Sequence, residues 1–415
     1  MDLENIKKFA KQSKKLYVYG AGVYGKFMGA WLDENSLLWN GFVVSEISNQ
    51  ENVLGRSVTL ISKANKEDAS YIVAVSKKYR NEIVEILHRN GIKKYICIDT
   101  NIEKKLPNVL KYTVTYPHEH VAVLLYHRVA DLDIDPQMLA VSKKNFEEQI
   151  KYIKNNFNVL KFDDDWTKVT NDSIVITFDD GYVDNLLYAL PILEKYEVPA
   201  TIFVSTGFIG KKKEQMCHDL ERFLLLNDKL PYKLKAFNKI YNLNSRQNVE
   251  LAYWDIHNIL QKLPNEKKEK ALLELAKRCN THLLPRKEYM VVSKEQLLKL
   301  DASQYITIGS HTVTHTRLSN ESQENQDYEL KESKIFLENI LGHDVKLFSY
   351  PFGGKKDYNE YTIKKVRDVG YIKAAANFSG LVGEKCDFMQ IPRNLIRNWD
   401  AREFSRQISI IFDFL

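Results

Sequence analysis

The chain has 415 residues, of which 44% are hydrophobic and 27% are charged; this is the balance of an ordinary globular protein, and the length predicts two domains rather than one core. The 60 basic and 54 acidic residues leave a net charge of +6. Such dilute positive charge argues against a nucleic-acid-binding protein, but it suits contact with anionic lipid or phosphate-bearing molecules. The four scattered cysteines predict neither a disulfide framework nor a thiolate metal site.

No apolar run in the sequence approaches the roughly 20 residues that span a bilayer. Residues 1–15 carry charges throughout and lack the apolar region of a secretory signal. We therefore expect a cytoplasmic protein, whose positive charge allows a peripheral contact with the inner face of the membrane. These features do not set the oligomeric state.

The first predicted domain, residues 1–104, is built around a glycine-rich turn. A short apolar strand leads into Gly20, Gly22 and Gly25, and a helix follows. This is the Gly-x-Gly-x-x-Gly pattern between a strand and a helix. In this pattern the glycines allow a tight turn, and a phosphate can approach the free N–H groups of the helix.

Further strands extend this domain. A second strand, residues 41–45, ends at Glu46, about where an acid would meet a ribose hydroxyl. Strands over residues 71–75 and 95–98 flank a helix over residues 81–89. This order predicts a small parallel sheet.

Residues 20–25, 54–58 and 80–82 resemble the Rossmann-like N-terminal domains of sugar-modifying enzymes such as the nucleotide-sugar acetyltransferases. The resemblance implies a nucleotide or nucleotide-sugar ligand. A purely architectural domain and an NAD-binding domain are the alternatives. NAD is disfavoured because the segment is too short for a full dinucleotide fold.

Residues 105–120, with two prolines, are predicted to link this domain to a second one over residues 121–415. The second domain opens with a buried strand, residues 121–126, that ends at His127. A single histidine after a strand is commonly a hydrogen-bonded structural residue. From its position alone, His127 is therefore either structural or part of an active site.

Two adjacent carboxylates follow a later buried strand, residues 174–178. Asp179 and Asp180 precede Gly181, where the backbone must turn. Ionised neighbours repel each other, so the pair indicates a metal site or a shared proton. A solvated turn is the alternative.

A second polar turn follows a strand over residues 305–308. Beyond it, His311 and His315 stand four apart, a spacing at which one helical turn points both imidazoles at one centre. An aspartate and two histidines form a ligand set that leaves metal positions open for water and substrate. The two turns together predict a catalytic metal site.

Strands and helices alternate along the second domain except over residues 211–302. There, apolar residues at helical spacing predict a helical insertion that covers the substrate groove. A capping box at residues 293–296 precedes one helix, and residues 323–341 form another that ends at Gly342. The alternation predicts an α/β domain built as a (β/α) barrel.

Three stretches of this domain, residues 177–182, 311–315 and 348–353, resemble the motifs of the polysaccharide deacetylases with a NodB homology domain, carbohydrate esterase family four. The resemblance covers roughly residues 121–400. It is close to the branch with Leu-Tyr-His at residues 125–127, which includes exopolysaccharide N-deacetylases. It implies an irregular (β/α) barrel.

The resemblance also implies roles for single residues. Asp180, His311 and His315 would hold a divalent metal, for which zinc is best suited and cobalt, nickel or iron are alternatives. Asp179 would act as general base on a water molecule. The backbone N–H of Tyr182 would stabilise the oxyanion that forms on the amide carbonyl.

The sequence departs from the family pattern at two places. Ser349 stands where the third motif usually has an arginine, and residues 391–396 lack the histidine that acts as general acid in many members. We expect Arg393 to supply the missing positive charge and to orient Asp179. His127 is the expected general acid.

These features predict a metal-dependent hydrolase that removes an N-acetyl or N-formyl group from an amino sugar in surface polysaccharide or glycolipid biosynthesis. The sugar would be nucleotide-linked, lipid-linked or polymeric. One alternative is a nucleotide-sugar-binding or NAD-dependent sugar-modifying protein that uses the glycine-rich turn and has a non-catalytic deacetylase-like domain. An interaction scaffold is another.

Overall fold

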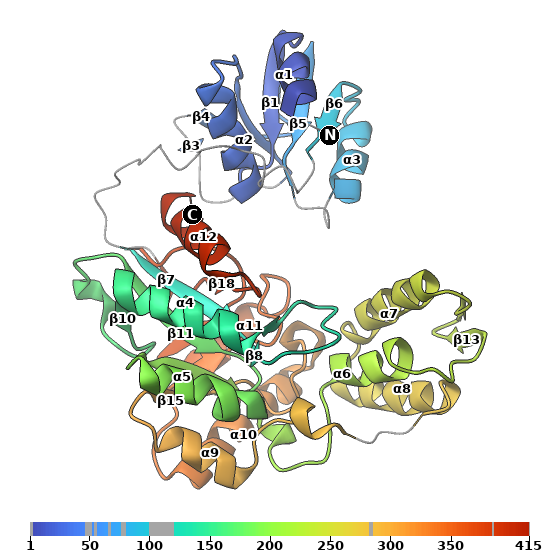
Figure 1. Ribbon diagram of the computed structural model, residues 1–415. Coiled ribbons are helices and arrows are strands. Elements are labelled where there is room, and N and C mark those ends of the chain that lie inside the picture. Colours follow the sequence, from blue (N-terminus) through green and yellow to red (C-terminus); the bar gives the residue numbers. More distant parts are fainter. Residues whose placement is uncertain are drawn as a thin grey trace. The chain divides into compact units, whose positions relative to one another are not determined.

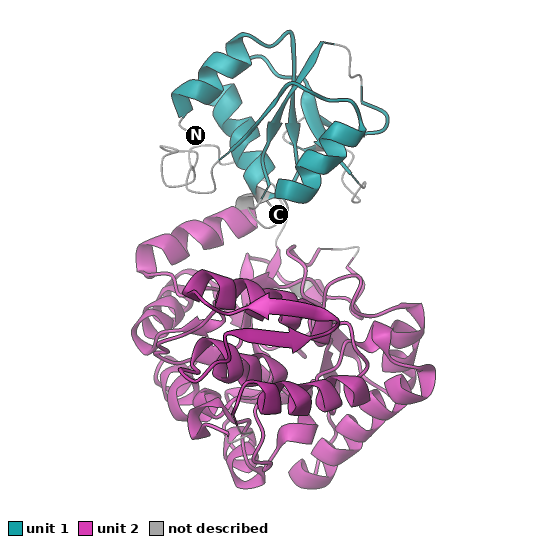
Figure 2. Ribbon diagram, turned by 90° about the vertical axis from the view of Figure 1, so that its right-hand side faces the viewer, with its two compact units in different colours: residues 1–117, 413–415 teal, residues 118–412 magenta. Residues whose placement is uncertain are grey.

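The computed structural model describes residues 3–45, 52–53, 56–64, 68–75, 80–98, 120–281, 285–383 and 386–414. The chain forms two compact units, residues 1–117 with 413–415 and residues 118–412 (Figure 2). The predicted linker, residues 105–120, lies almost wholly outside the described residues. The domain limits drawn from the sequence therefore remain predictions.

The first unit contains a sheet of six strands in the order β3-β4-β2-β1-β5-β6. The strands are β1 (Lys15–Tyr19), β2 (Gly41–Val44), β3 (Asn52–Val53), β4 (Arg56–Leu60), β5 (Ala69–Val73) and β6 (Tyr95–Cys97). β3 is antiparallel to β4, and the other pairs are parallel. The five parallel strands lie in the order β4-β2-β1-β5-β6. If they are renumbered 1 to 5 by their order in the chain, this becomes 3-2-1-4-5, the order of a doubly wound sheet.

Helices of the first unit pack against this sheet. They are α1 (Leu3–Lys11), α2 (Val23–Glu34) and α3 (Arg80–Arg89). One core joins apolar side chains of β1, β2 and β5 to α2, as the fully buried Val18, Phe42 and Ile72 show together with Trp31. The strand, glycine-rich turn and helix expected at the start of the chain are therefore present.

The second unit contains a parallel sheet in the order β17-β16-β15-β12-β11-β7-β18, and β10 also pairs with β11. The strands are β7 (Val121–Tyr126), β10 (Asn158–Leu160), β11 (Ser173–Phe178), β12 (Ala200–Val204), β15 (Ile306–Ser310), β16 (Leu347–Ser349), β17 (Lys373–Ala375) and β18 (Asn394–Leu395). A single bridge from Ala375 to Ile391 links the two ends. The predicted α/β class is confirmed, and the sheet is a partial barrel.

Helices alternate with these strands (Figure 1). They are α4 (Lys143–Asn156), α5 (Leu190–Lys195), α6 (Met216–Leu220), α7 (Arg246–Leu260), α8 (Asn265–Arg278), α9 (Lys294–Asp301), α10 (Gln323–Leu341), α11 (Glu360–Asp368) and α12 (Ala401–Phe414). Ser142 caps α4, the expected capping box is present at Ser293, and Gly342 ends α10 with φ 76°. No helix in the described part of the chain is long and apolar enough to cross a membrane.

The segment between β12 and α9 leaves the barrel and projects to one side of the unit (Figure 1). It contains α6, α7, α8 and a hairpin of β13 (Lys233–Ala236) and β14 (Lys239–Asn242). A hydrophobic core of its own joins these elements, with Leu220, Tyr253 and Leu272 among its members. α9, by contrast, contacts β15 and α10 of the barrel.

The hairpin is a feature that the helical interpretation of this segment missed. Its two turn residues, Phe237 and Asn238, both have positive φ, 50° and 59°. Turns of this kind match the twist of the strands, but they usually carry glycine or asparagine at both positions. Because phenylalanine occupies the first turn position, the sequence lacks the residue pattern that predicts such a hairpin turn.

Candidate metal centre

The carboxyl ends of the parallel strands place the polar residues of the second unit at one edge of the sheet. β7 ends before His127, β11 ends before Asp179, and β15 leads into His311. β7, β11, β12 and β15 are consecutive in the sheet. Side chains that are far apart in the sequence therefore meet at this edge.

The turn after β11 has a backbone that few residues tolerate. Asp180 has φ 77° and Gly181 has φ 75°. A Cβ atom on Gly181 would come within 2.8 Å of the Val204 side chain. Glycine is required at this position, and the strained aspartate before it points to a functional constraint.

Asp180, His311 and His315 lie together, and their potential ligand atoms are all within 4.8 Å of one another. Asp180 Oδ1 is 3.7 Å from His311 Nε2 and 3.3 Å from His315 Nε2. His311 donates its Nδ1–H to the carbonyl oxygen of Ser349 at 2.8 Å. This bond fixes the tautomer and leaves Nε2 free to face the cluster.

The protonation states of Asp180 and His315 suit a metal. Burial is the main cause that lowers the pKa of His315 to about 3, so its ring is neutral at neutral pH. Burial raises the pKa of Asp180, but the nearby histidines outweigh it and the pKa is lowered. One ionised carboxylate and neutral imidazoles are the donor set of a divalent cation. The cluster therefore fits the group that the sequence predicted.

The two histidines converge for a reason other than the predicted one. Residues 311–315 form an irregular loop rather than a helical turn, with φ 65° at Thr312 and 50° at His315. Glu329 of α10 accepts hydrogen bonds from the backbone N–H groups of Val313 and Thr314, at 2.8 and 2.9 Å. The loop is shaped by this buried carboxylate, and the four-residue spacing alone did not reveal it.

Asp179 lies beside the cluster, with Oδ2 3.9 Å from His311 Nε2, and pairs with Arg393. The guanidinium donates to both carboxylate oxygens, at 2.8 and 2.7 Å, and also to the Ser349 hydroxyl at 2.8 Å. Burial raises the pKa of Asp179, but Arg393 and His311 outweigh it and hold the pKa well below its usual range. The expected contact between Arg393 and Asp179 is thus present, and Ser349 completes it.

His127 lies close enough to the cluster to interact with both aspartates. Burial is the main cause that lowers its pKa, so the ring is neutral at neutral pH. Its Nδ1 is buried and has no hydrogen-bond partner among the described residues. A polar atom in this state fits a substrate group or a water molecule.

Tyr182 is buried, and its hydroxyl is 2.9 Å from His218 Nε2. Its backbone N–H, the group expected at the oxyanion, has no acceptor among the residues that the structure describes. His218 itself is buried and paired with Glu221 at 3.1 Å. The ring of His218 packs against both Tyr182 and Tyr289.

The glycine-rich turn of the first unit has two kinds of glycine. A Cβ on Gly25 would lie 1.8 Å from the carbonyl oxygen of Gly20, which itself has φ 105°. At Gly22, the N-cap of α2, nothing lies within 4 Å of the position that a Cβ would take. Gly20 and Gly25 therefore serve the fold, and Gly22 faces open space. Glu46 lies outside the described residues.

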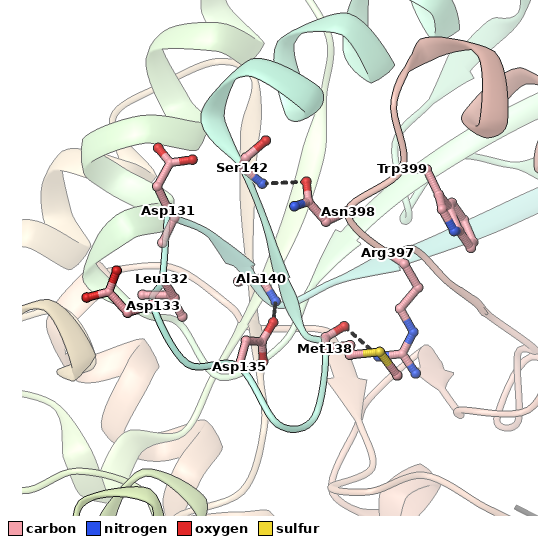
Figure 3. A pocket seen from close by; sticks show the side chains of 11 residues that line it. Asp131, Leu132, Asp133, Asp135, Met138, Ala140, Ser142, Arg397, Asn398 and Trp399 are labelled. Carbon is pink, nitrogen blue, oxygen red and sulfur yellow. Dashed lines mark hydrogen bonds between the residues drawn. The ribbon is translucent and has the colours of Figure 1, made fainter. Parts of the chain in front are cut away.

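A groove lined by both charged and apolar residues lies at the same sheet edge, beside the ends of β7 and β18 (Figure 3). It has a volume of about 610 Å³. Asp131 and Asp133 line one side, and Arg397 and Trp399 line the other. β7 is the direct neighbour of β11, so the groove and the metal-ligand cluster occupy the same edge.

Comparison with known proteins shows that the second unit is similar to one family. Residues 159–222 and 254–374 match the family model described as polysaccharide deacetylase. YxkH of Bacillus subtilis (strain 168), which is named for that family, is 24% identical over 277 residues; the alignment covers 65% of this chain and 69% of YxkH.

A second relative has a named substrate. Poly-beta-1,6-N-acetyl-D-glucosamine N-deacetylase of Staphylococcus aureus (strain MSSA476) is 32% identical over 169 residues, which cover 35% of this chain. The chain spans 55% of the length of that protein. Among solved structures, BC0361, a polysaccharide deacetylase from Bacillus cereus, has a TM-score of 0.44 at 21% identity, covering 70% of this chain and 69% of that one.

Proposed function

We propose that the protein is a metal-dependent carbohydrate N-deacetylase, because residues 159–222 and 254–374 match the polysaccharide deacetylase family model. It removes an acetyl or formyl group from the nitrogen of an amino sugar during the assembly of a surface polysaccharide or glycolipid. The observation that carries the proposal is the cluster of Asp180, His311 and His315 at the carboxyl edge of the sheet.

We assign the metal to Asp180, His311 and His315, with zinc as the first choice. A bound divalent cation lowers the pKa of a water molecule and polarises a carbonyl. Asp179 accepts the proton of the attacking water, and Arg393 and Ser349 hold its carboxylate in place. The free backbone N–H of Tyr182 donates to the oxygen of the amide as negative charge builds on it.

The departing amine must gain a proton, and His127 is the group proposed to pass one to it. Because the ring is neutral at rest, His127 must first take up the proton that Asp179 receives from the attacking water. Its Nδ1 is buried without a partner among the described residues and lies at the end of the strand next to β11. His127 interacts electrostatically with both Asp179 and Asp180.

The groove at the same sheet edge supports a chain-like sugar substrate. Its carboxylates and the half-buried Trp399 suit sugar rings that flank the one being hydrolysed. We therefore place oligomeric or polymeric amino sugars ahead of nucleotide-linked ones as substrates of this unit.

One experiment tests the function directly. The purified protein is analysed for bound metal, stripped with a chelator and reloaded with zinc, cobalt, nickel or iron. Each form is then offered N-acetylated and N-formylated sugars as monomers, nucleotide-sugars and oligomers, and released acetate or formate is measured. We expect release that requires metal and increases with oligomer length. A metal-loaded protein that releases neither acid from any substrate would contradict the proposal.

For the first unit we propose a Rossmann-like nucleotide-sugar site at Gly22. The doubly wound strand order and the uncrowded N-terminus of α2 support it. A cytoplasmic location, at the inner face of the membrane, remains a prediction from the sequence.

A further inference from the structure

The insertion contributes a side chain to the proposed metal centre. Gln215 is the N-cap of α6, at the point where the chain leaves the barrel. Its side-chain amide donates to Asp180 Oδ1 at 3.0 Å. Both residues are 3% exposed, so water does not compete for this bond.

The position of Gln215 is fixed by a buried ion pair that closes the base of the insertion. Glu214, before it, pairs with Arg286 from the returning chain through Nε at 3.1 Å and Nη2 at 2.6 Å. Glu214 is 1% exposed and also accepts the backbone N–H of Arg286. A two-point contact between a guanidinium and a carboxylate is directional as well as strong. The residue next to it is therefore held in a defined place.

Residues at both ends of the insertion also contact the turn that carries Asp180. His218 of α6 contacts the Tyr182 hydroxyl, and the returning chain pairs with the turn through the bridge between Tyr182 and Val291. Val292 N–H donates to the carbonyl oxygen of Gly181 at 3.0 Å. The turn is thus held by Gln215, by His218 and by the returning chain. Of these contacts, only the hydrogen bond from Gln215 is made to the Asp180 carboxylate itself.

We propose that Gln215 is a positioning residue for Asp180, through which the insertion sets the affinity of the metal centre. The inference rests on the proposed function, since it assumes that Asp180 is a metal ligand. A carboxylate oxygen has two lone pairs, so Oδ1 can accept the Gln215 amide with one and face the histidine nitrogens with the other. Ligating carboxylates are commonly held by such outer hydrogen bonds, and loss of one typically weakens metal affinity by about 10- to 100-fold.

The test compares Gln215→Leu with a control, Gln326→Leu. Gln326 is also buried, at 2% exposed, and forms hydrogen bonds with Thr362 and with the Glu321 backbone that the substitution would remove. The zinc dissociation constant of each full-length protein is measured by competition with a chelator, and kcat and KM are measured at saturating zinc. We expect Gln215→Leu to weaken zinc binding by about 10- to 100-fold and to leave KM for the sugar unchanged. The control should bind zinc as the parent does.

The outcomes separate this inference from the function on which it rests. A zinc dissociation constant for Gln215→Leu within about threefold of the parent overturns the inference and leaves the hydrolase proposal standing, because the measured effect would fall below the range for outer hydrogen bonds. A parent protein that does not bind zinc or another divalent metal overturns both. If Gln215→Leu fails to fold, Gln215→Asn, which keeps the amide but shortens its reach, must show the same loss of affinity, and parent-like binding in that variant also overturns the inference.

Discussion

Asp179 and Asp180 are neighbours in the sequence, yet their surroundings divide the work between them. Asp180 faces two imidazole nitrogens and one amide, whereas Asp179 is held by a guanidinium and a hydroxyl. Arg393 pairs with both oxygens of Asp179 and offsets its charge, so this carboxylate does not require a metal ion. The unsatisfied charge of the pair therefore lies on Asp180.

The first prediction follows from this division. Asp180→Asn should lose metal and activity together, because a neutral amide is a poor ligand for a divalent cation. Asp179→Asn should retain the metal and lose turnover. Metal content by elemental analysis and kcat on the same preparations make the comparison. Equal loss of metal in both variants would show that the two aspartates share the ligand role.

The second prediction concerns the stability of the Asp179 and Arg393 pair. Arg393→Met should destabilise the metal-free protein by about 3–5 kcal/mol, because it leaves a buried carboxylate without its partner. The double variant Asp179→Asn with Arg393→Met should recover part of this loss, since no buried charge is then unpaired. Urea unfolding gives the free energies. The absence of recovery in the double variant would show that Arg393 acts through packing alone.

The third prediction tests His127 as the proton donor. His127→Ala should keep its metal and fold but lose about 10²–10⁴-fold in rate, the usual contribution of a general acid. The loss should be smaller for substrates with a better leaving group, because these need less protonation. Rates are measured on an amide and an activated ester of the same sugar. A rate unchanged within about threefold, far below the general-acid range, would make His127 structural.

At the scale of elements, the sequence predicted the strands that carry the chemistry well and the connections between them poorly. Strand β7 and helix α10 have the limits that an apolar run and caps suggested, because burial on both faces of a strand leaves a continuous hydrophobic stretch. The loop that carries His315 could not be predicted, since its shape depends on Glu329 of α10. Gln215 was missed for the same reason: its partner is 35 residues away.

The insertion also has a titratable contact with the barrel. His257 of α7 is 5% exposed, and its Nε2 lies 3.2 Å from the side-chain nitrogen of Gln137 in the loop after β8 (Arg128–Val129). Burial is the main cause that lowers the pKa of His257 to about 4. In the unfolded chain its pKa returns to about 6.5. The native state therefore holds a neutral ring, which can accept this hydrogen bond.

The fourth prediction is that the insertion loosens in mild acid. The unfolded state binds a proton below about pH 6.5 and the folded state only below about pH 4, so the stabilisation is present above pH 6.5 and is lost as the pH falls to 4. Hydrogen exchange of α7 should accelerate between pH 7.5 and pH 5 after correction for intrinsic rates. His257→Gln should reduce this pH effect. An equal effect in the variant would assign it to other groups.

At the scale of the whole molecule, the chain combines two parallel sheets that present different chemistry. The second unit places carboxylates and imidazoles at its sheet edge, whereas the first places a glycine-rich turn and a helix N-terminus there. Both arrangements follow from the rule that parallel strands gather their connections at the carboxyl edge.

The final prediction decides whether the first unit binds a ligand. Gly25→Val is unsuitable, because its side chain would collide with the Gly20 carbonyl and disturb the fold. Gly22→Val is suitable, since nothing lies within 4 Å of the new Cβ, while a phosphate that approaches the α2 N–H groups would meet it. In the full chain, calorimetry with UDP- and dTDP-sugars should give heat that Gly22→Val abolishes, with metal content and deacetylation of oligomers unchanged. No heat from the parent with any of these sugars would establish the first unit as architectural.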